Sequence, residues 1–221
     1  MTVAAGLDSV RERIASAARA AGREPGDVTL VVVTKEHGVD DVRAALDAGA
    51  SDLGENRAQE LLAKADALEP DRRPRWHFIG RLQRNKVRAL ARHVALWESI
   101  DRAELAAEVG HRVPGAAVLV QVNIGEEPQK GGCEPDAAGA LVDACRASGC
   151  RVEGLMTVPP ATGDPRPVFA RLRRMTDDLG LRECSMGMSG DFEIAIAEGA
   201  TMVRVGTAIF GPRPGHADAR R

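Results

Sequence analysis

The stretches Ser185-Met186-Gly187-Met188-Ser189-Gly190-Asp191 and Val203-Arg204-Val205-Gly206-Thr207-Ala208-Ile209-Phe210-Gly211 decide the fold of this chain. Each begins as a short apolar run and continues into a turn of small residues, which is typical of a strand followed by a tight loop. The first turn leads directly into the helical pattern Phe192–Glu198. Small residues let backbone N–H groups approach an anion, and a helix N-terminus favours negative charge. Two such turns at the last two strands of a βα repeat predict a phosphate site.

The rest of the chain repeats one pattern, an apolar run followed by a polar turn and then by apolar residues at helical spacing. Strands are expected at Thr29–Lys35, Ser51–Glu55, Arg75–Ile79, Leu96–Ile100, Ala117–Ile124, Arg151–Val158, Cys184–Gly187 and Met202–Val205. Helices are expected at Leu7–Ala21, Val39–Ala48, Ala58–Leu68, Arg84–Arg92, Ala103–Val113, Pro135–Ser148, Pro167–Leu179 and Phe192–Glu198. The first of these helices places on one face Leu7, Val10, Ile14 and Ala18. Eight strands alternating with helices predict an α/β fold, a (β/α)8 TIM barrel with an extra N-terminal helix.

An open doubly wound sheet is the alternative architecture. It is disfavoured because no GxGxxG motif follows the first expected strand, where a dinucleotide-binding fold would place it. The 221 residues contain no long linker, low-complexity tract or change of composition. The loop 159–165 is the best candidate for a domain boundary, and it is too short to separate two domains. We therefore expect a single domain over residues 1–221.

The composition argues against several classes of partner. The 30 Lys and Arg residues nearly balance the 32 Asp and Glu residues, so the net charge of −2 indicates no polyanion partner. Aromatic residues make up 3% of the chain and do not interleave with a basic patch, which disfavours nucleic-acid binding. No long apolar run predicts a membrane span, and the charged N-terminal helix does not resemble a signal peptide. We expect a cytoplasmic monomer.

The four cysteines, Cys133, Cys145, Cys150 and Cys184, show no CxxC spacing and no matching pair of histidines. Reduced, partly buried thiols in a cytosolic protein are therefore expected. A zinc site is the remote alternative, and no metal ligands are predicted.

Lys35 follows the apolar run Leu30-Val31-Val32-Val33-Thr34. The other lysines are Lys64, Lys86 and Lys130, of which Lys64 and Lys86 fall in helical patterns and are expected to be solvated. Partial burial at a strand end would lower the pKa of the Lys35 amine toward the neutral form that imine formation needs. A lysine that merely extends to solvent is the alternative. In a closed barrel the first strand adjoins the eighth, so Lys35 and the phosphate turns meet, which suggests pyridoxal phosphate (PLP) held as an imine.

Ser189, Gly206 and Thr207 offer hydroxyl and amide groups for three phosphate oxygens. The alternative is that the glycines of the two turns only allow tight strand-to-helix connections. Two glycine turns in succession at the last strands favour the phosphate interpretation. Met188, beside Ser189 in the first turn, is included among the expected cofactor contacts.

Arg204 lies two residues before Gly206, so both face the same side of the last strand. Its acceptor is either the pyridine nitrogen of the cofactor or an acid such as Glu153 or Asp191. Arginine is a permanent donor, so it would leave that nitrogen unprotonated and weaken the ring as an electron sink. A weak sink suits carriage or storage of the cofactor better than carbanion chemistry.

Asn56 and His77 complete the set of expected cofactor contacts. Asn56 ends the second expected strand, and it either lies near the cofactor ring or its 3-hydroxyl or caps the following helix. His77 faces the barrel interior if Trp76 and Phe78 face the helices. A satisfied core histidine is the alternative to a cofactor contact there.

Several motifs resemble those of the pyridoxal phosphate homeostasis protein family, also called the YggS-type family: Val33-Thr34-Lys35, Gly54-Glu55-Asn56, Trp76–Gly80, Gly187-Met188-Ser189 and Val203–Gly211. The resemblance runs in order over nearly the whole chain. It implies a barrel similar to the N-terminal barrel of alanine racemase, with Lys35 as the imine lysine and Arg204 as the pyridine partner. It also implies that Ser189, Gly206 and Thr207 bind the phosphate. The implied function is intracellular vitamin B6 homeostasis, in which the protein buffers PLP and delivers it to recipient enzymes without established catalytic turnover.

The chain departs from the family pattern directly after Lys35. The family commonly continues with Thr-x-Pro, whereas this chain has Glu36-His37-Gly38. The departure changes the rim beside the expected imine. In the segment Glu126–Gly132, Lys130 resembles the lysine of a Lys-x-Gly loop of the family and is a second, weaker candidate for a transient amine.

Two enzyme functions are the alternatives to a carrier. A PLP-dependent amino-acid racemase needs an acid–base group on the second face of the substrate carbon. In alanine racemases this is a tyrosine from a partner subunit, whereas this chain contains no tyrosine, so Cys184 or His77 would have to replace it. A barrel enzyme acting on a phosphorylated sugar would share the phosphate site and use Lys35 as an aldolase-type amine. A yellow protein would indicate the pyridoxal imine and a colourless one would not.

Overall fold

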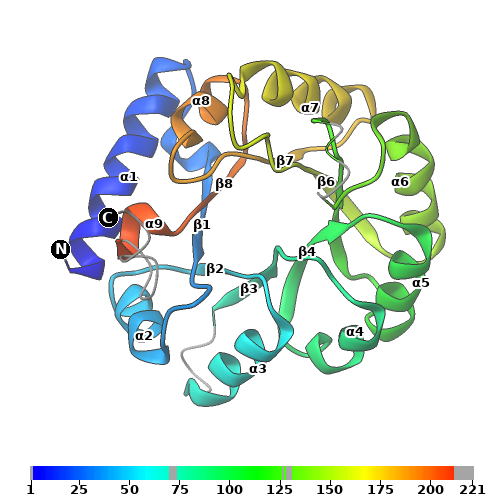
Figure 1. Cartoon of the computed structure of the whole chain (residues 1–221), viewed down its shortest axis with the longest axis horizontal. Coiled ribbons are helices and arrows are strands. Elements are labelled where there is room, and N and C mark those ends of the chain that lie inside the picture. The colour runs from blue at the N-terminus through cyan, green and yellow to red at the C-terminus, as the bar shows by residue number, and fades with distance from the viewer. Residues whose placement is uncertain (1, 70–73, 126, 128–130, 212–221) are drawn as a thin grey trace.

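Eight parallel strands close into a barrel in chain order, with β8 paired to β1 (Figure 1). The computed structural model describes residues 2–69, 74–125, 127 and 131–211. The strands are β1 (Thr29–Val33), β2 (Asp52–Glu55), β3 (Arg75–Phe78), β4 (Val94–Ile100), β5 (Ala117–Gln121), β6 (Arg151–Met156), β7 (Glu183–Ser185) and β8 (Met202–Val205). The predicted closed barrel is confirmed, and the open doubly wound sheet is excluded.

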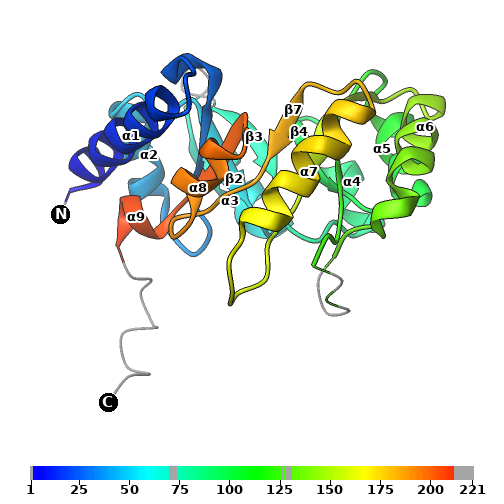
Figure 2. The same cartoon turned by 90° about the horizontal axis from the view of Figure 1, so that it is seen from above.

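Helices surround the ring of strands (Figure 1). They are α1 (Val3–Ala20), α2 (Val39–Asp47), α3 (Ala58–Ala67), α4 (Arg84–Leu90), α5 (Ala103–Arg112), α6 (Ala138–Ala147), α7 (Arg166–Asp178), α8 (Phe192–Ala197) and α9 (Thr207–Phe210), with short 3-10 helices η1 (Pro25–Asp27) and η3 (Pro135–Ala137). Figure 2 shows α1, α8 and α9 grouped on one side of the barrel, and both α8 and α9 contact α1. The short helix α9, which the sequence pattern did not predict, begins directly after the second glycine turn.

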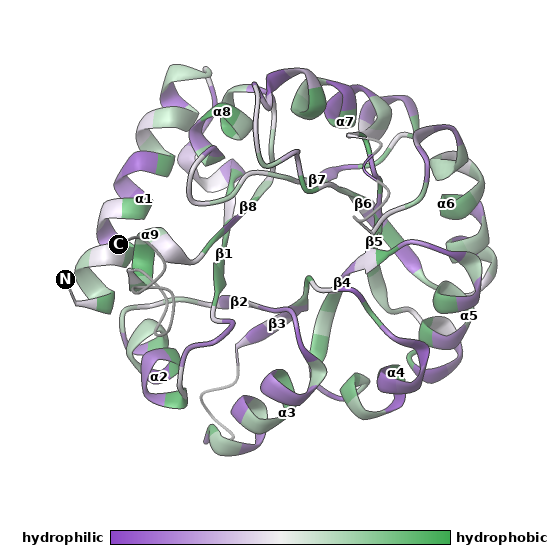
Figure 3. Ribbon diagram, in the orientation of Figure 1, coloured by the Kyte–Doolittle hydropathy of each residue, from purple (hydrophilic) through white to green (hydrophobic). Residues whose placement is uncertain are grey.

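The main hydrophobic core lies between the strands and the helices. The expected apolar face of α1 is confirmed, because Leu7, Val10, Ile14 and Ala18 are all buried there. The helix begins earlier than expected because the Thr2 side chain caps it, accepting a hydrogen bond from the Ala5 N–H at 3.3 Å. Figure 3 shows hydrophobic and hydrophilic residues alternating along the helices, as expected where one face packs on a sheet and the other meets solvent.

The space inside the ring of strands is partly polar. A small apolar cluster there comprises Leu96, Ala117, Leu119, Met156 and Met202, separate from the helix-facing core. Because side chains alternate along a strand, residues adjacent to helix-facing ones point into the ring. His77 lies between helix-facing Trp76 and Phe78, which confirms its expected inward orientation. Asp52, Glu98 and Arg204 are charged residues of other strands that are buried as His77 is.

Strands β1, β3, β5, β6 and β7 end earlier than the sequence pattern predicts. Strand β1 ends at Val33, and the backbone then turns, with the His37 N–H donating to the Thr34 carbonyl oxygen at 3.1 Å. Lys35 therefore lies in the loop that follows β1 rather than within the strand. The strand was predicted to continue past Val33 because Thr34 is β-branched. In the structure the hydrogen bond between His37 and Thr34 turns the backbone there instead.

The cysteines fit the expectation of reduced thiols. All four are unpaired, with Cys145, Cys150 and Cys184 buried and Cys133 half-buried. Burial raises the pKa of the Cys133 thiol to about 11 and that of Cys184 to about 11. Within the described ranges, no three His, Cys, Asp or Glu side chains gather as metal ligands. None of the helices in those ranges combines the length and apolar character needed to cross a bilayer.

Candidate functional site

A pocket of about 310 Å³ lies at the carboxyl ends of the strands, on the face where (β/α)8 barrels bind their ligands. The predicted site residues that line it are Lys35, Asn56, Met188, Ser189, Arg204, Gly206 and Thr207. The remaining lining residues are Val33, His37, Ile79, Val158 and Gly190. The fold thus brings the first strand end together with the last two, as a closed barrel requires.

The two glycine turns meet at one side of this pocket. The Ser189 hydroxyl oxygen accepts hydrogen bonds from the Gly206 N–H and the Ala208 N–H, both at 3.3 Å. At Gly206 a methyl group would lie 2.9 Å from the Val33 carbonyl oxygen, so glycine is needed for the close approach of β1 and β8. Gly187 has a φ of 91°, a conformation that favours glycine. The Ser189 hydroxyl keeps its own proton to donate toward the pocket.

Arg204 is buried in the barrel, and part of its side chain lines the pocket. Its Nη1 donates to Ser185 Oγ at 2.6 Å, and its Nη2 donates to the Thr157 carbonyl oxygen at 2.7 Å. Glu98 forms an ion pair with the guanidinium, with Nη1 and Oε2 4.0 Å apart. These contacts fix the orientation of the guanidinium at the base of the pocket.

The acids considered as partners of Arg204 form other contacts. Glu153 pairs with Arg151 at 2.7 Å, and Asp191 accepts a hydrogen bond from the Met188 N–H at 2.5 Å. The alternative that Arg204 pairs with an acid is therefore confirmed, but the acid is Glu98 and neither of the two that were named. Glu98 on β4 was missed because only the closed ring brings β4 across from β8.

Behind Arg204, five polar residues form a chain across the barrel, which we call the core network: Asp52, His77, Glu98, Ser185 and Arg204. His77 Nε2 lies 3.0 Å from Asp52 Oδ1, and His77 Nδ1 lies 2.6 Å from Glu98 Oε1. The Ser185 hydroxyl donates to Glu98 Oε2 at 2.6 Å. Burial alone would lower the pKa of His77, but the hydrogen bonds to the two acids outweigh it and raise the pKa to about 9. A protonated His77 is the result at neutral pH.

The structure corrects the expectation that His77 contacts the cofactor. Its side chain is 0% exposed, both ring nitrogens are bonded to carboxylates, and it is absent from the pocket lining. His77 is instead a core histidine with a hydrogen-bond partner at each ring nitrogen, which was the alternative considered from the sequence. Both acids that bind it lie on neighbouring strands, β2 and β4, so their proximity follows from the sheet.

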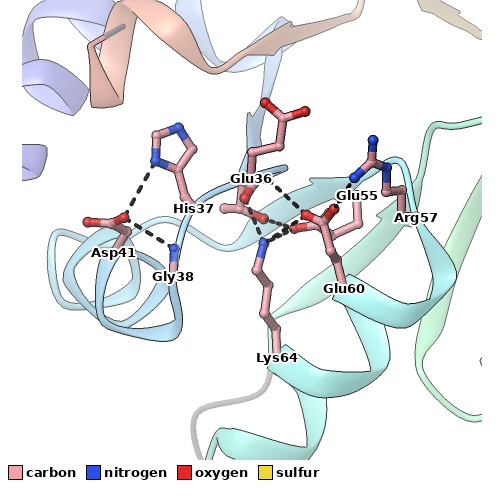
Figure 4. A network of polar contacts seen from close by, with 9 residues as sticks. Glu36, His37, Gly38, Asp41, Glu55, Arg57, Glu60 and Lys64 are labelled. Atoms are coloured by element: carbon pink, nitrogen blue, oxygen red, sulfur yellow. Dashed lines mark hydrogen bonds and ion pairs between the residues drawn. The ribbon is translucent and has the colours of Figure 1, made fainter. Parts of the chain in front are cut away.

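The structure also overturns the expectation that Lys64 is solvated. Its side chain is 6% exposed, and its Nζ contacts Glu55 Oε1 at 2.5 Å and the Thr34 carbonyl oxygen at 2.7 Å (Figure 4). The Thr34 hydroxyl donates to Glu55 Oε1 at 2.6 Å, and Glu60 lies 3.7 Å from Lys64. We call Thr34, Glu55, Glu60 and Lys64 the loop network. Burial raises the pKa of Glu55 against the opposing effect of Lys64.

His37 lines the pocket and was not predicted as a site residue. Its ring stacks on Phe210 with centroids 4.3 Å apart, and its Nδ1 lies 3.4 Å from Asp41 Oδ2 (Figure 4). His37 thereby joins the loop of Lys35 to α9, whose first residue is Thr207. The departure from the family pattern directly after Lys35 was the signal that could have identified it.

Asn56 lines the pocket, and its side-chain oxygen is buried without a hydrogen-bond partner among the described residues. The residue that caps α3 is Arg57, which forms no side-chain capping bond. The interpretation of Asn56 as a helix cap is therefore wrong. A buried carbonyl oxygen without a donor is costly, so a ligand hydroxyl or N–H would stabilise this site. Lys130, the second candidate amine, lies outside the described residues.

Comparisons with known proteins agree with this geometry. Residues 6–214 match the family described as alanine racemase, N-terminal domain. The "Pyridoxal phosphate homeostasis protein" of Pseudomonas aeruginosa is 43% identical over 222 residues, covering 96% of each chain. The structure of PipY from Synechococcus elongatus "with PLP bound" has a TM-score of 0.81 at 32% identity and covers 95% of this chain and 100% of that one. An alanine racemase from Corynebacterium glutamicum shares the fold, with a TM-score of 0.71 at 17% identity. The match covers 96% of this chain and 63% of the racemase chain. The chain therefore belongs to the pyridoxal phosphate homeostasis protein family, whose barrel is that of the alanine racemase N-terminal domain.

Proposed function

We propose that this chain binds PLP covalently through Lys35 and holds it in reserve for enzymes that require it. The observation that carries this proposal is the meeting of Lys35 with the two glycine turns in one pocket, although they are far apart in the sequence. In this proposal the protein acts as a cytoplasmic monomer in vitamin B6 homeostasis, and its macromolecular partners are recipient PLP enzymes.

The residues of the pocket fit the chemical groups of PLP. Ser189, Gly206 and Thr207 provide hydroxyl and amide donors for a phosphate, and Gly206 leaves space that a side chain would fill. The orphaned oxygen of Asn56 offers an acceptor for the ring hydroxyl. Arg204 offers a permanent donor to the ring nitrogen. When bound, the cofactor supplies an aldehyde that condenses with a lysine amine.

The same residues support storage rather than catalysis. Arg204 cannot give its proton to the ring nitrogen, so it does not promote the electron sink that racemisation uses. Cys184 and His77, the groups that would have to replace the racemase tyrosine, are fully buried and do not line the pocket. Neither of them can therefore act on a ligand in the pocket, and the histidine that does line it, His37, is stacked on Phe210 and lies 3.4 Å from Asp41 Oδ2.

The proposal is tested by an absorbance spectrum with and without borohydride, followed by peptide mapping. We expect the purified protein incubated with PLP to turn yellow and reduction to fix the label on the Lys35 peptide. Lys35→Ala should lose this absorbance, whereas Lys86→Ala, on α4 and outside the pocket, should keep it. A label chiefly on another lysine would contradict the role of Lys35. A wild-type protein that stays colourless would favour the sugar-phosphate alternative.

Robust exchange of the α-hydrogen of amino acids in deuterated buffer would contradict the carrier function. The wild-type protein loaded with PLP should exchange this hydrogen negligibly. Stereochemically complete exchange would support the racemase alternative instead, because racemisation requires removal of that hydrogen.

A further inference from the structure

The backbone turns sharply around Lys35 where β1 ends. The Thr34 carbonyl oxygen accepts the His37 N–H at 3.1 Å, which closes a tight turn with Lys35 and Glu36 at its centre. Glu36 has a φ of 65°, and it is the only non-glycine residue with positive φ in the described ranges. Residues with a side chain rarely adopt this conformation, and it persists where surrounding contacts hold it. The turn that carries Lys35 therefore requires support from outside itself.

Helix α3 provides this support through two side chains one helical turn apart (Figure 4). Lys64 Nζ donates to the Thr34 carbonyl oxygen at 2.7 Å, and the Glu36 N–H donates to Glu60 Oε2 at 2.8 Å. Arg57 donates to the second Glu60 oxygen at 3.3 Å, which orients that carboxylate. Charged groups of one helix thus hold the backbone on both sides of Lys35.

Stability alone does not account for a buried lysine at position 64. The side chains of Lys64 and Glu55 are 6% and 0% exposed. Removing two charges from water offsets most of their attraction, so a well-packed apolar pair would be as stable or more so. An ammonium group adds direction, because its hydrogen bond reaches one particular carbonyl oxygen.

We propose that Glu60 and Lys64 are positioning residues that fix the turn around Lys35 and direct its amine into the pocket. This inference rests on the proposed role of Lys35 as the cofactor lysine. Neither Glu60 nor Lys64 lines the pocket, so each acts through the backbone that it holds. Their removal should change the reactivity of the Lys35 amine while the phosphate turns stay intact.

The test measures the Lys35 amine in the full-length, cofactor-free protein. Lysines are labelled competitively with acetic anhydride across the pH range in which lysine titrates, and the Lys35 peptide is quantified. We expect labelling of Lys35 to be about tenfold slower in Glu60→Ala and in Lys64→Met, as expected for loss of a charged hydrogen bond. Asp66→Ala is the matched control, because Asp66 lies on the same helix, is 62% exposed and pairs only weakly with Arg92 at 3.7 Å.

A conservative variant separates the hydrogen bond from a general structural effect. Glu60→Gln keeps an acceptor oxygen for the Glu36 N–H, so it should recover most of the wild-type labelling rate. Equal losses in Glu60→Gln and Glu60→Ala would overturn the assignment of that bond. An unchanged labelling profile in folded Glu60→Ala and Lys64→Met would overturn the proposal as a whole.

A measurement on the wild-type protein covers the case in which a variant does not fold. Site-resolved hydrogen exchange should show the Glu36 amide protected, although it lies in a loop, and rapid exchange there would overturn the proposal.

PLP is then added to the same samples to test the proposed function separately. A wild-type protein with a protected Glu36 amide that gains no cofactor absorbance would contradict the proposed function, while the part of the inference that concerns how α3 holds the turn would stand.

Discussion

The core network and the loop network are both charged and both buried except at Glu60, which is half-buried, yet they hold different parts of the site. The core network ends on a side chain, Arg204, which lines the pocket. The loop network ends on backbone atoms of the turn that carries Lys35. One network therefore orients a guanidinium toward the pocket, and the other sets the path of the main chain.

The two networks also differ in how they carry their buried charge. Burial raises the pKa of Glu55 in the loop network even beside Lys64, so this carboxyl accepts a proton more readily than an ordinary glutamate does. In the core network, burial alone would raise the pKa of Glu98, but the hydrogen bond from His77 and the charges of His77 and Arg204 hold it below its usual value. Glu98 thus stays ionised and compensates two cations. The comparison teaches that equal burial does not mean equal tolerance to substitution.

The largest expected effect comes from removing the carboxylate at the centre of the core network. Glu98→Ala leaves His77 and Arg204 without their shared anion, and breaking a buried pair in this way costs about 3–5 kcal/mol. The free energy of unfolding in urea measures it, with Glu104→Ala on the exposed face of α5 as the control. Lys64→Met in the loop network should cost less, because Glu55 can take up a proton. Equal costs in the two networks would break the comparison.

The second effect is a loss of stability as the pH rises through the pKa of His77. The pKa of His77 rises from 6.5 to about 9 in the folded protein. Its contribution to the free energy of unfolding is therefore complete below pH 6.5 and is lost as the pH approaches 9. The difference corresponds to roughly 3 kcal/mol. Urea unfolding at intervals across this range measures it. A flat profile there would contradict a protonated His77.

The His77 ring itself can be followed by NMR, which separates it from other groups. Glu55 also has a raised pKa, so its contribution to stability has the same sign and is lost as the pH rises. An imidazole that stays protonated well above pH 6.5 would assign the effect to the core network. The exposed His111 serves as the internal control.

The smallest effect concerns the contact between the Lys35 loop and α9. His37 stacks on Phe210 at 4.3 Å, and an aromatic pair of this kind contributes about 0.5–1.5 kcal/mol beyond its buried area. A double-mutant cycle with His37→Ala and Phe210→Ala should show a coupling energy in this range. A coupling of zero would mean that the loop network alone holds the Lys35 turn. Coupling between Phe210→Ala and His111→Ala should be absent, because His111 lies on α5.

Patterns within single segments allowed most of the fold to be predicted. The alternation of apolar runs and helical spacing located the eight strands, and small residues identified the two turns that meet at Ser189 and Gly206. Errors arose at segment ends, where local hydrogen bonds such as that between Thr34 and His37 end a strand before its β-branched residues do. Pro135–Ala137 was predicted as part of the helix that follows it and forms a 3-10 turn instead, whereas the 3-10 helix η1 and the short α9 lay outside every predicted helix.

By itself, the sequence determined the identity of Lys35, the two glycine turns and the position of Arg204 on the last strand, because each depends on residues that are neighbours in the chain. Only the tertiary structure decided that Lys64 is buried, that Glu98 lies near Arg204 and that His77 is shielded from the pocket. Lys64 has an ordinary helical spacing, and nothing in that spacing indicates that Glu55 and the Thr34 carbonyl oxygen lie beside its amine. Buried charges are stable only with partners, and closure of the barrel brings those partners from strands and helices that are distant in the chain.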